Sequence, residues 1–448
     1  MPLMARINGD VIMACDSNLE FDTTIETLGP CKITTPVRYP RFVDESRPQQ
    51  LIMTPEELAE LDDETMLMEF EKAGPREKIY FDPSKTKCAI VTCGGICPGI
   101  NDVIRAIVME AHYKYGIRTV LGIRNGLRGF IPDYGYDVME LTPKNVTNIH
   151  HFGGTILGSS RGTQNSEEIV DSLERLNVNV LFVIGGDGTM RAAKAIVEET
   201  RKRKRKISVI GIPKTIDNDI NFITRSFGFD TAVEKATEAI QCAHVEATGM
   251  DGGVGLVKLM GREAGFIAAQ ATLALQDVNF LLVPESKFTL DGEHGLLKAL
   301  DRRLKHRKHA VIVCAEGAGQ DLMAEETVRD PSGNPKLGDI CGLLTGSIKQ
   351  YFTENDGECA VKFIDPSYII RSVPANAADR VYCGFLGQQA VHAAMSGKTG
   401  MVITHLKTTM VHLPLELVAI KRRTLNTHSD YWSVVMESTG QQDYFNPK

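Results

Sequence analysis

The sequence predicts an α/β fold in which mostly parallel sheets are covered by helices on both faces. Short apolar segments, such as residues 88–92 and 178–184, alternate with helix-length segments along most of the 448-residue chain. This alternation is typical of β-α-β units, and strands without polar positions indicate a sheet that is buried on both faces. Glycine-rich or charged segments follow several of these strands, where a parallel sheet binds its ligands.

The first 80 residues lack this alternation and are rich in Thr, Pro, Asp and Glu. Thr54 followed by Pro55 resembles the start of a helix, with Thr as the N-cap and Pro in the first turn. We interpret residues 1–80 as an N-terminal extension that packs on the main body of the protein.

From residue 87 onward the β-α-β pattern is regular. We expect strands at residues 88–92, 119–123, 178–184, 208–212, 255–258, 280–283, 310–314 and 401–404. We expect helices at residues 101–115, 188–201, 231–244, 293–304 and 377–396. A chain of this length is long enough for two or three domains.

The composition excludes several classes of protein. The formal net charge of -7, from 50 basic and 57 acidic residues, argues against general nucleic-acid binding. The ten Cys lack paired spacing, as is usual for reduced thiols in a cytosolic protein. There is no apolar run of about 18 residues and no signal-peptide pattern. We therefore expect a cytoplasmic protein with no membrane partner.

Two local features have both a functional and a plain interpretation. Cys93 and Cys97 flank a glycine turn, but the spacing favours buried structural thiols over a metal site. Residues 201–206 are six consecutive basic residues, which would suit a nuclear signal or a polyanion patch. In an acidic chain, a solvated helix end is the favoured interpretation, because cations stabilise the negative end of the helix dipole.

Two glycine-rich turns are candidate phosphate sites. Residues 94–99 follow a strand and open a helix, where glycines admit a phosphate and the helix supplies N–H donors. Residues 185–189, Gly-Gly-Asp-Gly-Thr, give the stronger signal. Asp187 cannot bind an anion directly, so it is a candidate ligand for Mg²⁺ bridging nucleotide phosphates. The alternative is an Asp that only stabilises the turn.

A charged cluster follows the next strand and points to the acceptor side of a phosphoryl transfer. Lys214, Thr215, Asp217 and Asp219 lie within six residues. A carboxylate such as Asp217 can take the proton of an attacking hydroxyl, and Lys214 can neutralise charge on the transferring group. Asp219 is a candidate for orienting the site or the metal. Turn formation by Asn218 and one Asp explains only part of this cluster.

With these motifs, residues from about 87 to 400 resemble the ATP-dependent 6-phosphofructokinases, with the motifs in family order. The match is similar to the longer branch of plants and trypanosomatids, which also has an N-terminal extension. The resemblance implies two Rossmann-like domains with the active site in the cleft between them. It implies a nucleotide-binding domain at 81–222, completed by about 372–410, a sugar-phosphate domain at 223–371 and a C-terminal tail at 411–448.

The resemblance also implies the reaction and its residues. The family transfers the γ-phosphoryl group of ATP, with Mg²⁺, to the 1-hydroxyl of fructose 6-phosphate in glycolysis. It implies an allosteric homo-oligomer, a dimer or a tetramer, with small-molecule substrates. The resemblance implies Asp217 as the catalytic base, and the charged cluster itself adds Lys214 and Asp219 as candidate catalytic residues. The implied ATP-binding positions are Gly95, Arg161, Gly162, Gly186, Asp187, Gly188 and Thr189, with Asp187 as the metal ligand. The implied sugar-phosphate positions are Thr215, Ile216, Asp217, Met260, Gly261, Arg262, Glu316, Lys362, Tyr368 and Arg371.

Some positions depart from the short bacterial pattern of this family. Gly253 and Lys362 stand where that pattern has Arg, and Lys362 corresponds to a position that reaches the sugar phosphate from a neighbouring subunit. Tyr368 replaces a His, and Lys214 replaces a Gly. The clamp on the 6-phosphate is therefore poorer in Arg, and Lys does not reproduce the bidentate fork of Arg.

Donor specificity depends on Gly188 and Lys214. The pyrophosphate-dependent branch has an Asp at the position of Gly188, where it would face the ATP α-phosphate. Two like charges about 4 Å apart cost roughly 4 kcal/mol at an effective dielectric near 20. Gly188 removes that charge and favours ATP, whereas Lys214 occurs with both donors. The alternatives are a pyrophosphate-dependent enzyme, a lipid- or NAD-kinase-like enzyme with the same glycine loop, and a sugar-phosphate sensor without catalysis.

Overall fold

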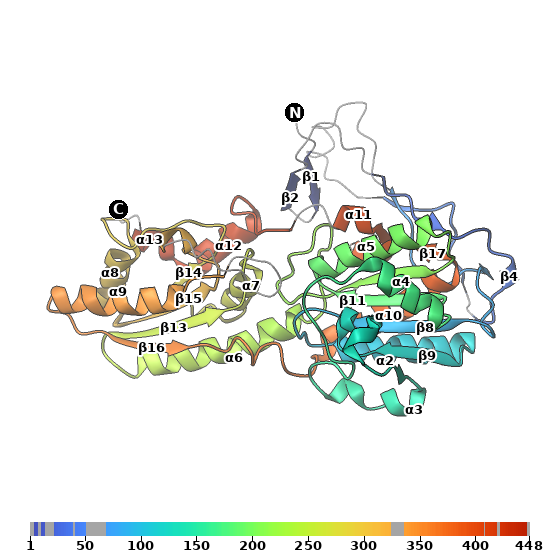
Figure 1. The fold of residues 1–448 in the computed structure, drawn as a ribbon. Coiled ribbons are helices and arrows are strands. Elements are labelled where there is room, and N and C mark those ends of the chain that lie inside the picture. The colour runs from blue at the N-terminus through green and yellow to red at the C-terminus, as the bar shows by residue number, and fades with distance from the viewer. Residues whose placement is uncertain are drawn as a thin grey trace.

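The computed structural model describes residues 4–7, 10–13, 22–38, 41–50, 69–323, 336–406, 408–418 and 422–445. These residues form two α/β lobes that lie side by side (Figure 1). The predicted helix start at Thr54 lies outside the described residues. No helix in the described ranges is long and apolar enough to cross a membrane.

The first lobe is built on a seven-stranded sheet, ordered β10-β9-β8-β11-β12-β18-β19. Its five central strands run parallel, and the two edge strands are antiparallel to their neighbours. In chain order the strands are β8 (Lys87–Thr92), β9 (Thr119–Ile123), β10 (Met139–Glu140), β11 (Val180–Gly185), β12 (Ser208–Pro213), β18 (Met401–Leu406) and β19 (Thr409–Pro414).

Alternate residues of these strands serve two separate cores, because successive strand side chains point to opposite faces. Phe182 and Ile184 of β11 pack in the cluster that contains α2 and α10. Leu181 and Val183 pack in the cluster that contains α4 and α5. The helices are α2 (Ile100–Glu110), α4 (Ser166–Arg175), α5 (Asp187–Lys202) and α10 (Ala377–Met395). Burial on both faces explains why the sequences of these strands are nearly continuous apolar runs.

The second lobe has a four-stranded parallel sheet, ordered β14-β15-β13-β16. One face of it packs against α6 and α7 and the other against α8 and α9. The strands are β13 (Gly253–Leu259), β14 (Phe280–Leu282), β15 (His309–Ala315) and β16 (Ala360–Ile364). The helices are α6 (Phe229–Thr248), α7 (Phe266–Leu275), α8 (Leu296–Arg307) and α9 (Ile340–Glu354).

The described part of the N-terminal extension forms short strands. They are β1 (Met4–Ile7), β2 (Asp10–Met13), β3 (Glu26–Thr27), β4 (Ile33–Thr34), β5 (Gln49–Gln50), β6 (Glu69–Phe70) and β7 (Lys78–Ile79). Strand β3 pairs with β17 (Lys398–Thr399), and the partly buried Glu71 forms an ion pair with Lys398 at 2.8 Å and a hydrogen bond with His412 at 3.1 Å. The extension is thus attached to the first lobe.

The last part of the chain contributes elements to both lobes. Strands β18 and β19 and the short helix α11 (Leu415–Val418) belong to the first lobe. Helix α12 (Asp430–Thr439) contacts α7, and α13 (Gln441–Phe445) contacts α8, so both pack on the second lobe. The remaining short elements are α3 (Pro143–Val146), a π-helical turn at Ala111–Tyr115 and 3-10 turns at Gly126–Phe130, Pro132–Tyr134, Ile149–His151 and Gln320–Leu322.

The basic run at residues 201–206 lies at the carboxyl end of α5 and is paired with acids. Arg201 pairs with Glu26 at 2.6 Å, and Arg203 pairs with Glu199 at 2.6 Å. Such pairing favours the interpretation as a solvated helix end, where cations also meet the negative end of the helix dipole.

Candidate active site

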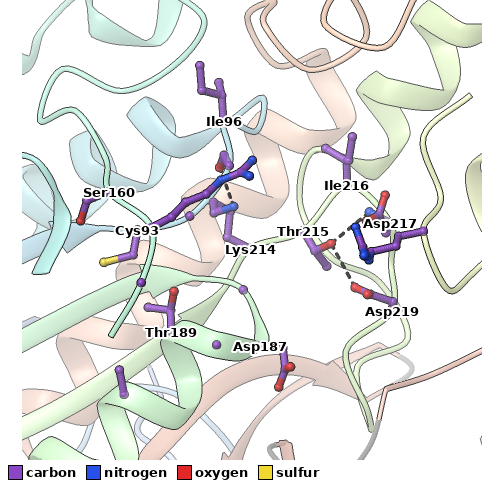
Figure 2. A pocket seen from close by; sticks show the side chains of 18 of the residues that line it. Cys93, Ile96, Ser160, Asp187, Thr189, Lys214, Thr215, Ile216, Asp217 and Asp219 are labelled. Atoms are coloured by element: carbon purple, nitrogen blue, oxygen red, sulfur yellow. Dashed lines mark hydrogen bonds between the residues drawn. The ribbon is translucent and has the colours of Figure 1, made fainter. Parts of the chain in front are cut away.

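A cleft of about 790 Å³ lies where the loops after β8, β11 and β12 of the first lobe meet loops of the second. Most of the residues that were predicted from the sequence to form the site line this cleft, and Figure 2 shows the side chains of several of them. The nominated residues that line it are Gly95, Arg161, Gly162, Gly186, Asp187, Gly188, Thr189, Lys214, Thr215, Ile216, Asp217, Asp219, Met260, Arg262, Glu316, Tyr368 and Arg371. The described parts of its lining do not include Gly261 or Lys362.

The glycine loop between β11 and α5 forms one wall of the cleft. A Cβ at Gly185 would lie 2.3 Å from Thr189 Oγ1, so only glycine fits the backbone there. Helix α5 begins at Asp187, so its N-terminal N–H groups and dipole face the cleft and suit an anion. At Gly188 a Cβ would meet nothing closer than Arg191 Nη2 at 3.8 Å, an ordinary van der Waals contact, so a side chain fits at this position without a clash.

Asp187 is held by two arginines. Its Oδ2 accepts from Arg191 Nη1 at 2.5 Å, one turn along α5, and lies 3.7 Å from Arg422 Nε. The described residues contain no cluster of three His, Cys, Asp or Glu side chains that would hold a metal by itself. A single carboxylate beside a phosphate cradle fits Mg²⁺, which binds proteins through one or two carboxylates together with substrate phosphates.

Lys214 is buried between the glycine loops. Its side chain is 5 % exposed, and its Nζ donates to the Gly95 carbonyl at 2.8 Å. Burial lowers the pKa of this ammonium, whereas the nearby Asp217 charge raises it. The geometry places a cation at the turn of residues 94–99, midway along the site (Figure 2).

Asp217 and Asp219 lie on the loop that follows β12. The Thr215 hydroxyl donates to Asp219 Oδ1 at 3.1 Å and accepts from the Asp217 N–H at 3.1 Å, which fixes the loop (Figure 2). Asp217 Oδ1 is buried and has no hydrogen-bond partner among the described residues. Burial raises the pKa of Asp217 well above its usual range, and the Asp219 and Glu316 charges raise it further.

Asn218 stabilises the conformation of this loop. It lies in the left-handed region with φ of 55°, where Asn is tolerated better than most residues. Its side chain accepts from Ser226 N at 2.9 Å and donates to the Thr224 carbonyl at 3.2 Å. Turn formation thus accounts for Asn218 but leaves the two carboxylates facing the cleft.

The second lobe contributes the opposite wall. The Gly317 N–H donates to the Gly261 carbonyl at 3.1 Å, which ties the loop after β13 to the end of β15. Burial raises the pKa of Glu316, which lines the cleft. The Arg371 guanidinium lies 5.0 Å from the centre of the Tyr368 ring, which is 72 % exposed.

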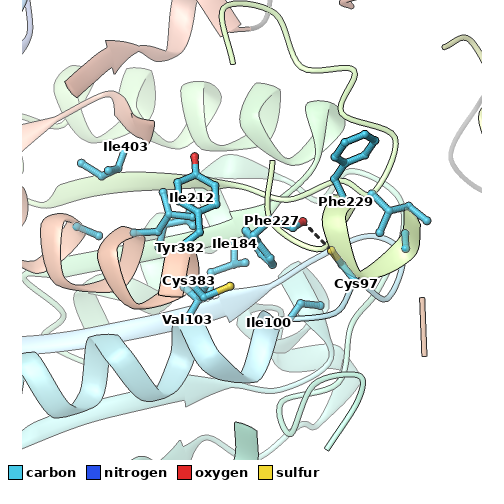
Figure 3. Packing of buried hydrophobic residues seen from close by; sticks show 14 of the residues in the cluster. Cys97, Ile100, Val103, Ile184, Ile212, Phe227, Phe229, Tyr382, Cys383 and Ile403 are labelled. Atoms are coloured by element: carbon cyan, nitrogen blue, oxygen red, sulfur yellow. Dashed lines mark hydrogen bonds between the residues drawn. The ribbon is translucent and has the colours of Figure 1, made fainter. Parts of the chain in front are cut away.

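Lys362, which was predicted to bind the sugar phosphate, and Cys97 lie elsewhere. Lys362 is on β16, where its Nζ is 4.0 Å from Glu246. Cys97 lies in a buried core cluster that also contains Ile184 and Tyr382, and its thiol donates to the Phe227 carbonyl at 3.1 Å (Figure 3). Burial raises the pKa of the Cys93 and Cys97 thiols to about 12, as befits structural cysteines.

Sequence reasoning missed several charged residues of the cleft. Arg191 could have been found because it lies four residues after Asp187 on one helix face. Lys258, two residues before Met260, pairs with Asp365 at 2.5 Å. Arg422 gave no signal, because its place in the cleft depends on long-range packing of the C-terminal part.

Comparisons with known proteins agree with this geometry. The family model described as Phosphofructokinase matches residues 87–394. The chain is 46% identical over 439 residues to the ATP-dependent 6-phosphofructokinase of Borreliella burgdorferi, covering 95% of this chain and 98% of the relative. It is 47% identical over 372 residues to the ATP-dependent 6-phosphofructokinase of Trypanosoma brucei brucei, covering 82% and 76%.

Solved structures show the same fold. A pyrophosphate-dependent phosphofructokinase from Marinobacter aquaeolei superposes with a TM-score of 0.65 at 21% identity, covering 81% of this chain and 91% of that chain. Phosphofructokinase from Saccharomyces cerevisiae superposes with a TM-score of 0.61 at 22% identity, covering 80% and 48%. The α/β fold with two lobes predicted from the sequence is thereby confirmed. Together with the family model and the close relatives, this shows that the chain belongs to the phosphofructokinase family.

Proposed function

We propose that this protein transfers the γ-phosphoryl group of MgATP to the 1-hydroxyl of fructose 6-phosphate, giving fructose 1,6-bisphosphate and ADP. The observation that carries the proposal is Asp217, which lines the cleft that also holds the Asp187 glycine loop and whose buried Oδ1 has no hydrogen-bond partner among the described residues. The close relatives are named as ATP-dependent 6-phosphofructokinases.

Asp217 is suited to the role of general base. A sugar hydroxyl becomes a good nucleophile only as its proton leaves, and a positioned carboxylate takes that proton. A raised pKa makes Asp217 a stronger base than an exposed carboxylate, and the residue lines the cleft in which the hydroxyl would bind. The Thr215 hydroxyl holds the loop in place, because it donates to the Asp219 carboxylate and accepts from the Asp217 N–H.

The glycine loop and Lys214 are suited to the donor. The loop of residues 185–189 and the start of α5 would cradle the phosphates, with Asp187 as the protein ligand of Mg²⁺. When bound, Mg²⁺ neutralises charge on the phosphates. Lys214, at the start of the neighbouring loop after β12, would add a positive charge whose position costs no reorganisation during the reaction.

The sugar phosphate is proposed to bind between the loops at Met260–Arg262, Glu316 and Tyr368–Arg371. All but Gly261 of the nominated residues in these loops line the cleft. Lys362 lies on β16 away from the described lining, and in this proposal it would serve the site of a neighbouring subunit. A homo-oligomer, a glycolytic role and a cytoplasmic location belong to the same proposal, which rests on family membership.

The substitution Asp217→Ser tests the proposal. It removes the base but keeps a small polar side chain, so kcat should fall about 10²–10⁴-fold while fructose 6-phosphate still binds. Binding is measured by isothermal titration calorimetry and turnover by a coupled assay of ADP release. Full activity of the variant would contradict the assignment of Asp217. Loss of sugar binding together with activity would show a structural rather than a chemical role.

A further inference from the structure

One short segment near the C-terminus joins both lobes to the catalytic loop. We call residues 422–425 the crossing segment. The backbone of Arg422 forms a β-bridge with Ile220, and the Arg423 N–H donates to the Asp219 carbonyl at 2.8 Å. At the other end, the Leu425 N–H donates at 2.8 Å to Glu285, which also accepts from the Gly265 N–H of the second lobe.

The side chain of Arg422 also contacts residues of both lobes. Its Nη1 lies 2.7 Å from Glu263 Oε1, directly after the Met260–Arg262 loop of the second lobe. Its Nε lies 3.7 Å from Asp187 Oδ2, at the start of α5 in the first lobe. The guanidinium presents several donors in one plane, so a single Arg can contact two carboxylates at once.

Arg191 provides a contrast within the same site. It binds the same Asp187 oxygen at 2.5 Å, but both residues belong to α5. Arg191 therefore cannot transmit a change from one lobe to the other. The pair between Arg422 and Glu263 involves a carboxylate that is 49% exposed, and such pairs contribute little to stability. The position of Arg422, rather than its stabilising effect, suggests its role.

We propose that Arg422 is a positioning residue that couples the nucleotide subsite to the sugar-phosphate subsite. This inference rests on the function proposed above. A nucleotide arriving at Asp187 and a sugar phosphate arriving beside Glu263 each meet the same guanidinium. The first ligand orders the crossing segment and brings the lobes to their bound spacing, so the second ligand binds with a smaller ordering cost. The coupling is reciprocal, as any coupling between two bound ligands must be.

Calorimetry of the full-length protein tests this inference without turnover. The non-hydrolysable analogue AMP-PNP is titrated with excess MgCl₂, once alone and once with saturating fructose 6-phosphate. We expect fructose 6-phosphate to tighten analogue binding by at least about fivefold, the lower end of ordinary coupling. In Arg422→Gln the two dissociation constants should agree within about twofold, because the side-chain link from Asp187 to Glu263 is gone.

Three further variants separate coupling from simple damage to the site. Glu263→Gln removes the other end of the link and should also abolish the coupling. Arg422→Lys keeps the charge without the planar fork and should retain part of it. Arg191→Gln is the matched control: it should change the affinity for the analogue but leave the ratio between the two titrations as in the parent protein. If Arg422→Gln does not fold, Glu263→Gln provides the same test from the other lobe.

The outcomes distinguish this inference from the proposed function. Binding of both ligands by the parent protein without tightening would overturn the coupling and leave the proposed function intact. So would full coupling in both Arg422→Gln and Glu263→Gln. If the parent protein does not bind fructose 6-phosphate at all, the proposed function and the inference fail together.

Discussion

At the scale of single residues, the chemistry depends on carboxylates placed where their negative charge is costly. Burial and the neighbouring Asp219 and Glu316 raise the pKa of Asp217, while Lys214 and Arg422 oppose that rise. Shifted pKa values are common where a side chain must exchange a proton during a reaction. The unpartnered oxygen of Asp217 would be an unexplained cost if the residue only supported packing.

The substitution Asp219→Asn should move the pH profile in a predictable direction. The base must be ionised, so kcat/KM falls as the pH drops below the raised pKa of Asp217. Removing the Asp219 charge lowers that pKa, so the acid limb of the profile should shift to lower pH. Initial rates from pH 5.5 to 9 measure the shift. A limb that stays in place, or moves to higher pH, would contradict the role of Asp217 as base.

The substitution Gly188→Asp should weaken the use of ATP selectively. A Cβ at this position would make no clash, so the fold should tolerate the side chain, but its charge would face the nucleotide phosphates. We expect a loss of kcat/KM for ATP of about fivefold or more, from a charge repulsion of roughly 1–4 kcal/mol. The matched control is Gly188→Asn, which has the same shape without the charge. Equal losses in both variants would mean that size, not charge, sets the donor.

Many of the site residues could be predicted from the sequence because local motifs hold them together. Asp187 and the cluster from Lys214 to Asp219 each follow a buried strand, and parallel strands bring their carboxyl ends together. Arg422 could not be predicted, because no local pattern shows that the chain crosses back to the cleft there. Lys258 was missed because a Lys in a strand usually faces solvent.

At the scale of secondary-structure elements, apolar runs located the strands well. The strand predicted at residues 119–123 is observed as Thr119–Ile123, and the strand predicted at 208–212 as Ser208–Pro213. The helix predicted at 101–115 is less regular: the α-helix ends at Glu110, and a π-helical turn continues to Tyr115. The helix expected from residue 293 begins at Leu296, because residues before it form a turn around Gly292 and Gly295.

The attachment of the extension depends on Glu71. Burial alone would raise its pKa, but the hydrogen bonds and charges of His412 and Lys398 outweigh burial and lower the pKa of Glu71 to about 2. A carboxylate with a lowered pKa stabilises the fold at pH values above its ordinary pKa, and the contribution is lost as the pH falls toward the folded-state value.

The substitution Glu71→Gln should therefore destabilise the protein at pH 7 by about 1.5–3 kcal/mol, the usual contribution of a hydrogen bond to a charged group. Urea denaturation at pH 7 and at pH 3.5 measures the difference. We expect the substitution to cost less stability at pH 3.5, because the parent protein has by then lost part of the stabilisation that the ionised Glu71 provides. An equal or larger effect in acid would contradict the ion-pair account.

At the scale of the whole molecule, the site exists because the chain passes between the lobes more than once. The chain leaves the first lobe after β12, builds the second lobe, returns through α10 to β18 and β19, and ends on the second lobe with α12 and α13 (Figure 1). Sequence periodicity identifies such elements one by one. It does not show which lobe each segment joins, so the contacts of the crossing segment with both lobes could not be predicted from the sequence.

The most direct test of the central claim is a ³¹P NMR time course of the protein with Mg²⁺, fructose 6-phosphate and one donor at a time. With ATP, the γ-phosphorus signal should decay as signals of ADP and of a new phosphomonoester on the sugar 1-oxygen grow in equal amounts. Pyrophosphate should give at most slow turnover. Rapid product formation with pyrophosphate and none with ATP, or no phosphate on the 1-oxygen with either donor, would contradict the account.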